Sequence, residues 1–287
     1  MSASQTRPHR GVARRVLRGF GELLITLGVV VLLFVVYELY VTDLFGERKQ
    51  AQATTAVDRV WAQAEATATV VAPATDATAT DVPTTDPRER VPRYDVTAGQ
   101  GFAKLRIPAL GADYVFTVVE GTDPDDLYVG PGHYPQTQLP GEQGNFAVAG
   151  HRVSKGSPFN DLGLLNSCDA VVVETQDDWF VYRVLPMAEQ ESTWAATPRP
   201  HCAGVQVQTG AYAGVHGRQI TVPTDYAQVL PIPTVLSTTI PPDAQRLITL
   251  TTCHPQFSDA ERMIIHGVLV RSYPKAPGFL PPELSET

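Results

Sequence analysis

Residues 246–270 read RLITLTTCHPQFSDAERMIIHGVLV, a stretch with a clear strand pattern. Two runs rich in β-branched and aliphatic residues, Arg246–Thr252 and Met263–Val270, stand on either side of a polar loop, which predicts two strands joined by a short connection. Cys253 follows the first run, and a proline comes two residues later. Because proline cannot continue a central strand, we expect this cysteine at a strand exit, open to a cleft. Arg262 stands just before the second run.

A third polar residue stands at the exit of an upstream strand. The stretch GNFAVAGHR predicts a strand over Asn145–Ala149, followed by Gly150 and His151. A thiol with a pKa of about 8.5 is a weak nucleophile at neutral pH unless other groups assist it. A guanidinium favours the thiolate and offers donors to an oxyanion, and an imidazole exchanges protons with the thiol and the leaving group. We therefore predict a catalytic trio of Cys253, His151 and Arg262.

The rest of the folded region reads as short strands separated by turn signals. Further strand-like runs lie at Phe102–Ile107, Tyr114–Val119, Ala170–Glu174 and Trp179–Val184. Short helical segments are expected at Asp123–Tyr128, Pro158–Leu165 and Asp225–Val229. Many short strands without long helical periodicity favour a mostly β domain, either a sandwich or a closed barrel.

The motifs around the trio resemble those of a known family. Thr249, Leu250, Thr252 and Cys253 match a TLxTC strand, with an arginine downstream and a histidine upstream in GPGHYPQTQLPGEQGNFAVAGHR. In this order they resemble the motifs of the sortase family, most closely class E with class D as a near neighbour, over residues 102–270. Taken singly, the cysteine reads as a small buried hydrophobe, the histidine as a turn residue and the arginine as a solvated charge. The ordered set is far more specific than any single motif.

The resemblance implies a closed eight-stranded β-barrel with short helices, and a membrane-anchored cysteine transpeptidase. Cys253 would attack the Thr–Gly carbonyl of a C-terminal sorting signal, LPxTG-like or, in class E, LAxTG. Arg262 would steady the oxyanion and His151 would protonate the leaving amine. A cell-wall amine, such as that of a lipid II-like precursor, would then take the acyl group. The implied partners are surface proteins with sorting signals, this precursor and the membrane.

Two further residues and one long connection are expected to contact the substrate. Tyr134 lies in the loop before the histidine strand, where a class E tyrosine is associated with a preference for Ala over Pro in the signal. The alternative for Tyr134 is a loop aromatic packed on the barrel. Thr252 lies in the motif beside the nucleophile. The connection from Ala188 to Gln245 is rich in Pro and Gly, and its counterpart in the family holds the sorting peptide.

The sequence gives no reason to expect a metal or another cofactor. His201, His216 and His266 have no metal-like spacing with the cysteines, and His266 reads as a packing or surface residue inside a strand. His133 and His254 flank the motifs. Either could be mistaken for the catalytic base, and either could be a hydrogen-bond partner of the trio. The formal net charge of −8 argues against nucleic acid as a partner.

The N-terminal region predicts a membrane anchor. Residues 1–19 form a basic tail with five arginines and no acidic residue, and Phe20–Val41 is an apolar run of 22 residues. At about 1.5 Å per residue such a helix spans a bilayer. The arginines predict a cytoplasmic N-terminus and an extracellular domain. A cleaved signal peptide is the alternative. Signal peptides, however, have a shorter apolar region than this run, with a cleavage site close behind it.

The remaining boundaries follow from composition. Residues 42–93 are rich in Ala, Thr and Pro and are expected to be a disordered linker, although Gln50–Thr69 could prolong the helix. The catalytic domain is predicted over 94–274, and a disordered Pro-rich tail over 275–287.

The cysteine count predicts a disulfide. Three cysteines in an exported protein suggest one pair and one free thiol, so Cys168 and Cys202 are expected to be bonded and Cys253 free. Two unrelated buried thiols are the alternative.

Other functions stay open at this point. A papain-like peptidase, which releases its product to water, carries its cysteine before its histidine, whereas His151 precedes Cys253 here. An L,D-transpeptidase has a cysteine motif rich in Ser and Gly, which is a poor match to this chain. A surface assembly protein with an inactive barrel would have lost a catalytic residue, and the sequence keeps all three.

The predicted orientation is testable on intact cells. Protease added to protoplasts should remove the domain from position 94 onward and spare the basic tail and the apolar run, because the arginines hold the N-terminus inside. Full protection of the domain, under conditions in which detergent exposes it, would contradict this topology.

Overall fold

The computed structural model describes residues 10–37, 42–68, 96–196 and 200–286. Parts of the predicted basic tail, of the predicted membrane helix (38–41) and of the linker (69–93) lie outside the described residues. The described strands are β1 (Gly101–Arg106), β2 (Val115–Glu120), β3 (Gly132–His133), β4 (Gly144–Ala149), β5 (Ala170–Glu174), β6 (Asp178–Val184), β7 (Arg218–Thr221), β8 (Arg246–His254) and β9 (Glu261–Pro274).

Helices are few within the barrel domain. The α-helices are α1 (Arg10–Val36), α2 (Thr42–Ala68) and α3 (Pro124–Leu127) in the described ranges. The 3-10 helices are η2 (Pro108–Leu110), η3 (Leu162–Leu164), η4 (Ala188–Ala196), η5 (Pro200–Cys202), η6 (Gly210–Tyr212), η7 (Tyr226–Val229) and η8 (Pro282–Ser285). The predicted short helices correspond to α3 and η7, whereas Pro158–Leu165 is helical only in its η3 part.

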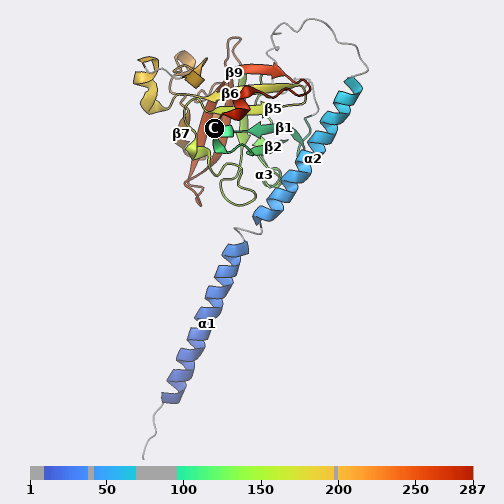
Figure 1. Ribbon diagram of the computed structural model, residues 1–287. Helices are drawn as coiled ribbons and strands as arrows, with labels where there is room; N and C mark the ends of the chain where they lie inside the picture. The colour runs from blue at the N-terminus through green and yellow to red at the C-terminus, as the bar shows by residue number, and fades with distance from the viewer. Residues whose placement is uncertain (1–9, 38–41, 69–95, 197–199, 287) are drawn as a thin grey trace, which may run out of the picture.

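Eight strands close into a barrel, as predicted. Their order is β6, β5, β1, β2, β3, β4, β8, β9, and β9 pairs back onto β6 (Figure 1). One edge of β9 pairs with β8, and the C-terminal half of its other edge pairs with β6. The N-terminal half of that second edge, Arg262–Ile265, pairs with β7, which is therefore an additional strand outside the ring.

Each of the seven predicted strands is present, and two others were missed. β3 has only two residues, which pair in parallel with β2 and antiparallel with β4. β7 reads Arg-Gln-Ile-Thr, with a single aliphatic side chain. Neither segment has an alternating apolar run long enough to predict a strand, so both depend on neighbouring strands that already exist.

Side chains of β8 and β9 alternate between the inside and the outside of the barrel. Ile248 and Leu250 of β8 and Ile265 of β9 belong to the interior apolar cluster. Since side chains alternate along a strand, Cys253 and Arg262 lie on the opposite, outer face of the same strands.

A second apolar cluster lies outside the ring and contains a disulfide. Cys168 and Cys202 are bonded, with their Cα atoms 5.1 Å apart, as the cysteine count predicted. Trp194 of the long connection and Leu247 of β8 are buried in the same cluster. A bridge across such a loop stabilises by about 3–4 kcal/mol through the entropy of the unfolded chain. The long connection is therefore fastened to the outer wall of the barrel.

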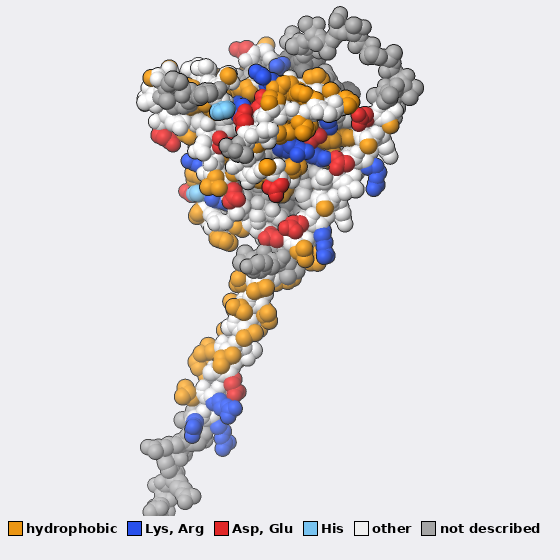
Figure 2. Space-filling model, in the orientation of Figure 1, with side chains coloured by type: hydrophobic (Ala, Val, Ile, Leu, Met, Phe, Trp, Pro, Cys, Tyr) orange, Lys and Arg blue, Asp and Glu red, His pale blue; other side chains and the backbone are white. Residues whose placement is uncertain are grey.

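α1 is long and apolar enough to cross a membrane. Of the helices in the described ranges it meets this criterion, over Arg14–Val36, with a mean hydropathy of 2.5 and none of the span buried. It projects away from the barrel (Figure 1), and Figure 2 shows apolar side chains around it and basic side chains near its N-terminal end. These features are compatible with the anchor predicted from the sequence.

The predicted disordered linker is wrong over Thr42–Ala68, which forms α2 and packs against β1 and β2 (Figure 1). Val57 is 2% exposed. The Gln50 amide donates to the Val129 carbonyl at 3.0 Å and to the Thr117 carbonyl at 3.2 Å. An Ala- and Thr-rich segment has no sustained apolar period, so its composition did not indicate that it docks.

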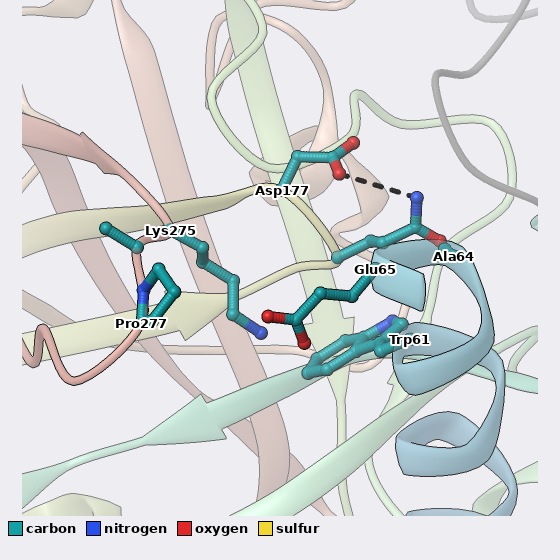
Figure 3. Close-up of a pocket in the computed structure, with 8 residues that line it drawn as sticks. Trp61, Ala64, Glu65, Asp177, Lys275 and Pro277 are labelled. Carbon is teal, nitrogen blue, oxygen red and sulfur yellow. Dashed lines mark hydrogen bonds between the residues drawn. The ribbon is translucent and has the colours of Figure 1, made fainter. Parts of the chain in front are cut away.

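The C-terminal end of α2 lies far from the candidate trio. It borders a pocket of about 450 Å³ beside the turn between β5 and β6. Figure 3 shows Trp61, Glu65 and Lys275 around this pocket, and the Lys275 ammonium is 4.1 Å from the centre of the Trp61 ring. Lys275 follows the last residue of β9, whereas Arg262 is near its first, so this end of α2 and Arg262 lie at opposite ends of β9.

The predicted disordered tail also needs correction, since the tail is ordered as far as residue 286. Arg183 is 7% exposed, and its guanidinium donates to the Glu286 carboxylate at 2.8 Å. The Tyr273 hydroxyl donates to buried Glu283 at 3.2 Å. A buried guanidinium requires an acceptor, and the tail supplies one.

Candidate active site

Parallel pairing of β4 with β8 brings two strand exits together. Ala149 stands beside Thr251, and the Gly150 amide donates to the Thr251 carbonyl at 3.0 Å. His151 and Cys253 each lie two residues beyond that pair. Neighbouring strands are about 4.8 Å apart, so the backbones of these two residues run side by side at the end of the sheet.

Arg262 stands across from the cysteine on the other side of β8. In the antiparallel pairing of β8 with β9, Cys253 is directly opposite Arg262. Directly opposite residues have Cα atoms about 4.5–5.5 Å apart and side chains on the same face. In this structure the Arg262 guanidinium donates to the carbonyls of Asp259 at 3.0 Å and Glu261 at 2.9 Å. The three predicted residues therefore meet at one edge of the barrel, with the guanidinium held by its own loop.

The imidazole of His151 is half-buried and uncharged at neutral pH. Burial, together with the nearby Lys155 ammonium, lowers the pKa of His151 to about 4. Its Nε2 is buried and has no hydrogen-bond partner among the described residues. A neutral imidazole with a free ring nitrogen is able to accept a proton from a neighbouring thiol.

Arg152 ties the histidine loop to the cysteine strand, a contact that the sequence did not indicate. One Nη of Arg152 lies 3.3 Å from the Cys253 carbonyl oxygen and 2.7 Å from His254 Nδ1. His254 is therefore engaged with Arg152 rather than placed as a base. The sequence shows an arginine directly after His151, but it does not indicate that the Arg152 side chain points toward β8.

Cys253 is the free thiol of the three cysteines, all of which are described, and it is half-buried. Its neighbour Thr252 is 3% exposed, and the Thr252 hydroxyl donates to the Gly150 carbonyl at 2.8 Å. The burial of this side chain does not favour the predicted contact of Thr252 with substrate, which stays a prediction. Its side chain faces away from the cysteine's face and joins β8 to the exit of β4.

Tyr134 lines a groove next to the trio. Its hydroxyl is 3.0 Å from the hydroxyl of Thr251, which is two residues before Cys253 on the same face of β8. The adjoining cavity of about 450 Å³ lies between the β3–β4 loop and the connection from β7 to β8. Its lining residues are Thr122, Tyr134, Pro135, Gln136, Thr137, Tyr226, Val229, Leu230, Pro231 and Thr238.

Two other histidines have structural positions. His133 is fully buried; its Nδ1 lies 2.6 Å from a Glu120 carboxylate oxygen and its Nε2 3.0 Å from the Thr137 hydroxyl. His266 is buried and contacts the Thr249 hydroxyl at 2.8 Å, and burial with the nearby His216 lowers the pKa of His266 to about 3. His266 is thus a packing residue. Within the described ranges, no group of three or more His, Cys, Asp or Glu side chains is placed to hold a metal ion.

Comparison with known proteins gives one consistent family. The family described as "Sortase domain" matches residues 105–270. The sequence is 30% identical over 271 residues to Sortase SrtE1 of Streptomyces coelicolor, covering 91% of this chain and 59% of that protein. It is 29% identical to Sortase SrtE2 of the same organism, covering 93% of this chain and 86% of that protein. The expected likeness to class E is confirmed by these two relatives.

The fold agrees with the sequence comparisons. The solved structure of the SrtF sortase from Corynebacterium diphtheriae is similar with a TM-score of 0.62 and 48% sequence identity. The match covers 69% of this chain and the whole of that one. The part of this chain outside the match is therefore about as long as the segments that precede the barrel domain.

The charge state of His151 is testable by titration. Replacing Lys155 with alanine removes a like charge, so the pKa of His151 should rise above its value of about 4. Nuclear magnetic resonance of the histidine ring protons over pH 3 to 8, with assignment by a His151→Gln variant, measures it. Lys275→Ala, at the opposite end of β9, should leave it unchanged. A His151 pKa at the ordinary value of about 6.5 would contradict the account.

Proposed function

Because the chain belongs to the sortase family, whose members are cysteine transpeptidases, we propose that it cuts a C-terminal sorting signal between Thr and Gly and joins it to a cell-wall amine. The observation that carries the proposal is the meeting of His151, Cys253 and Arg262 at one barrel edge, through the pairings of β4 with β8 and β8 with β9. A nucleophile, a proton carrier and a cation are the groups that acyl transfer requires.

The first half of the reaction forms a thioester. His151 takes the thiol proton, and the Cys253 sulfur bonds to the threonine carbonyl carbon. The carbonyl electron pair moves to oxygen and returns as the carbon–nitrogen bond to glycine breaks. His151 gives its proton to the departing glycine amine, so the imidazole ends neutral, as it began.

The second half releases the acyl group to an amine. The acceptor nitrogen attacks the thioester carbon, loses its proton to His151, and the Cys253 sulfur leaves as a thiolate that recovers the proton. Because water is able to attack the same thioester, hydrolysis is the competing outcome, and a well-filled groove favours the amine by excluding water.

Arg262 is proposed to stabilise the oxyanion in both halves. It stands opposite the nucleophile on the same face of the sheet. Its present acceptors are two carbonyls of its own loop, Asp259 and Glu261. An oxyanion carries a full negative charge, so the guanidinium is attracted to it more strongly than to a neutral carbonyl. The guanidinium is therefore proposed to turn from the loop to the substrate once negative charge develops there.

The groove beside Tyr134 is proposed to hold the sorting signal. The part of its lining that comes from the β7–β8 connection is largely apolar, with Tyr226, Val229, Leu230 and Pro231. It lies one i, i+2 step along β8 from the nucleophile, about 7 Å, which suits a peptide whose threonine carbonyl reaches Cys253. The α1 span and the basic residues before it support a membrane anchor with the barrel outside the cell.

The nucleophile is tested by trapping the thioester. The protein incubated with a sorting-signal peptide should gain the mass of the acyl fragment, and Cys253→Ala should gain none. The double variant Cys168→Ala/Cys202→Ala should still be acylated, because its missing thiols form the structural disulfide. An adduct that persists in Cys253→Ala would contradict the assignment.

Adding an amine acceptor distinguishes a transpeptidase from a peptidase. Formation of the peptide–amine conjugate supports the proposal, and hydrolysis alone at saturating amine contradicts it.

The signal preference is tested with paired peptides. LAxTG peptides should have a higher kcat/KM than LPxTG peptides, and Tyr134→Ala should reduce the ratio by about tenfold, the size of a small change in one pocket. Tyr226→Ala, on the other wall, is the comparison variant. If the proline peptide is preferred, the class E expectation fails. If the ratio is unchanged in Tyr134→Ala, only the residue assignment fails.

A further inference from the structure

The loop that carries His151 has a conformation that requires outside support. Ser154, Lys155 and Ser157 have φ values of 58°, 53° and 42°, and Gly156 between them has 80°. A residue other than glycine in this left-handed region costs about 1–2 kcal/mol. Three such residues in one loop persist only where surrounding groups fix them.

The hydrogen bonds from the barrel domain hold the base of this loop. The Phe159 amide donates to the His151 carbonyl at 2.9 Å, which closes the loop, and the Phe159 ring is fully buried. The Tyr114 hydroxyl donates to the Pro158 carbonyl. These contacts fix the two ends of the loop, whereas the tip, residues 154–157, has a looser contact with the barrel domain, the Lys155 ammonium 5.8 Å from the centre of the Tyr128 ring.

The N-terminal turns of α2 hold the tip. The Gly156 amide donates to an Asp43 carboxylate oxygen at 3.0 Å. Gly46 is buried against the loop backbone, and a β-carbon at Gly46 would lie 2.5 Å from the Lys155 carbonyl carbon. The absence of a side chain at this position therefore allows the helix to lie directly on the loop.

We infer that α2 is a positioning element of the active site, acting through the contacts of Asp43 and Gly46 with the tip of the His151 loop. The inference rests on the proposed function. It gives part of the segment that was predicted to be a disordered linker a role in catalysis. Neither residue touches substrate, so both are positioning residues.

The contact has a direct route to the imidazole. The tip contains Lys155, the ammonium that repels a proton from His151, and the loop is closed by a hydrogen bond of His151 itself. If the tip is released, the loop samples other conformations, and His151 faces the thiol for a smaller fraction of the time. The groove beside Tyr134 does not contact α2, so peptide binding should not change.

The experiment compares four full-length variants with the wild type, the fourth being Gly46→Ala. Asp43→Ala removes the acceptor, and Asp43→Asn restores an oxygen at the same place. Asp58→Ala is the matched control, because Asp58 is also an α2 carboxylate paired to the barrel, through Lys104, but it is far from the loop. The measurements are kcat and KM of peptide-to-amine transfer, and amide hydrogen exchange of residues 153–158.

We expect Asp43→Ala to lower kcat about 3- to 10-fold, the effect of losing one hydrogen bond, with KM unchanged and faster exchange at Gly156. Asp43→Asn and Asp58→Ala should match the wild type. Gly46→Ala should also lower kcat, although alanine is the better helix former, and this variant decides the matter if Asp43→Ala does not fold.

Equal kcat in Asp43→Ala and Asp58→Ala, or a change in KM alone, overturns the inference. If the wild type forms no acyl-enzyme, the proposed function fails instead. Hydrogen exchange then decides the positioning contact by itself: faster exchange in Asp43→Ala but not in Asp58→Ala supports it, and equal exchange overturns it.

Discussion

Parallel pairing of β4 with β8, in the register that sets Ala149 beside Thr251, is the constraint on which the site depends. In a strand, a shift of one residue turns every side chain to the opposite face, so the same sequence in another register would send the imidazole and the thiol to different sides. The Thr252 hydroxyl bound to the Gly150 carbonyl fastens the register at the exit itself. The antiparallel partner β9 then adds a cation opposite the thiol.

Polar groups on the outer face of these strands fix the covering segments. The Asn145 amide donates to the Gln228 and Leu230 carbonyls, at 3.2 and 3.1 Å, and so holds the connection from β7 to β8 over the barrel. Thr249 donates to Asn145 at 2.8 Å and contacts His266. Buried polar groups of this kind destabilise unless all are satisfied, which makes the position of the covering segment specific. The groove wall with Tyr226 is part of that segment.

The strands, and the position of the three candidate residues at strand ends, were predictable because their signals are local. Alternating aliphatic runs mark β1, β2 and β8, and the residues at the exits of β4 and β8 belong to short motifs. The register that joins them was not readable from the sequence. The missed elements depend on distant partners: β3 and β7 are completed by neighbouring strands, and α2 is held by Gln50 and Val57 on the barrel. The tail is ordered because Arg183, remote in sequence, is buried and requires Glu286.

The guanidinium of Arg262 is the part of the site whose arrangement the proposed mechanism requires to change. It now donates to carbonyls of its own loop, while the proposed chemistry needs it at the acyl oxygen. The most direct test is a crystal structure of the full chain with Cys253 joined to a sorting-signal analogue as a tetrahedral adduct, in which the acyl oxygen carries a negative charge. The account predicts the guanidinium about 2.7–3.1 Å from the acyl oxygen, with the His151 imidazole beside the sulfur. A guanidinium still bound to Asp259 and Glu261, with an acyl oxygen that no protein group contacts, would contradict it.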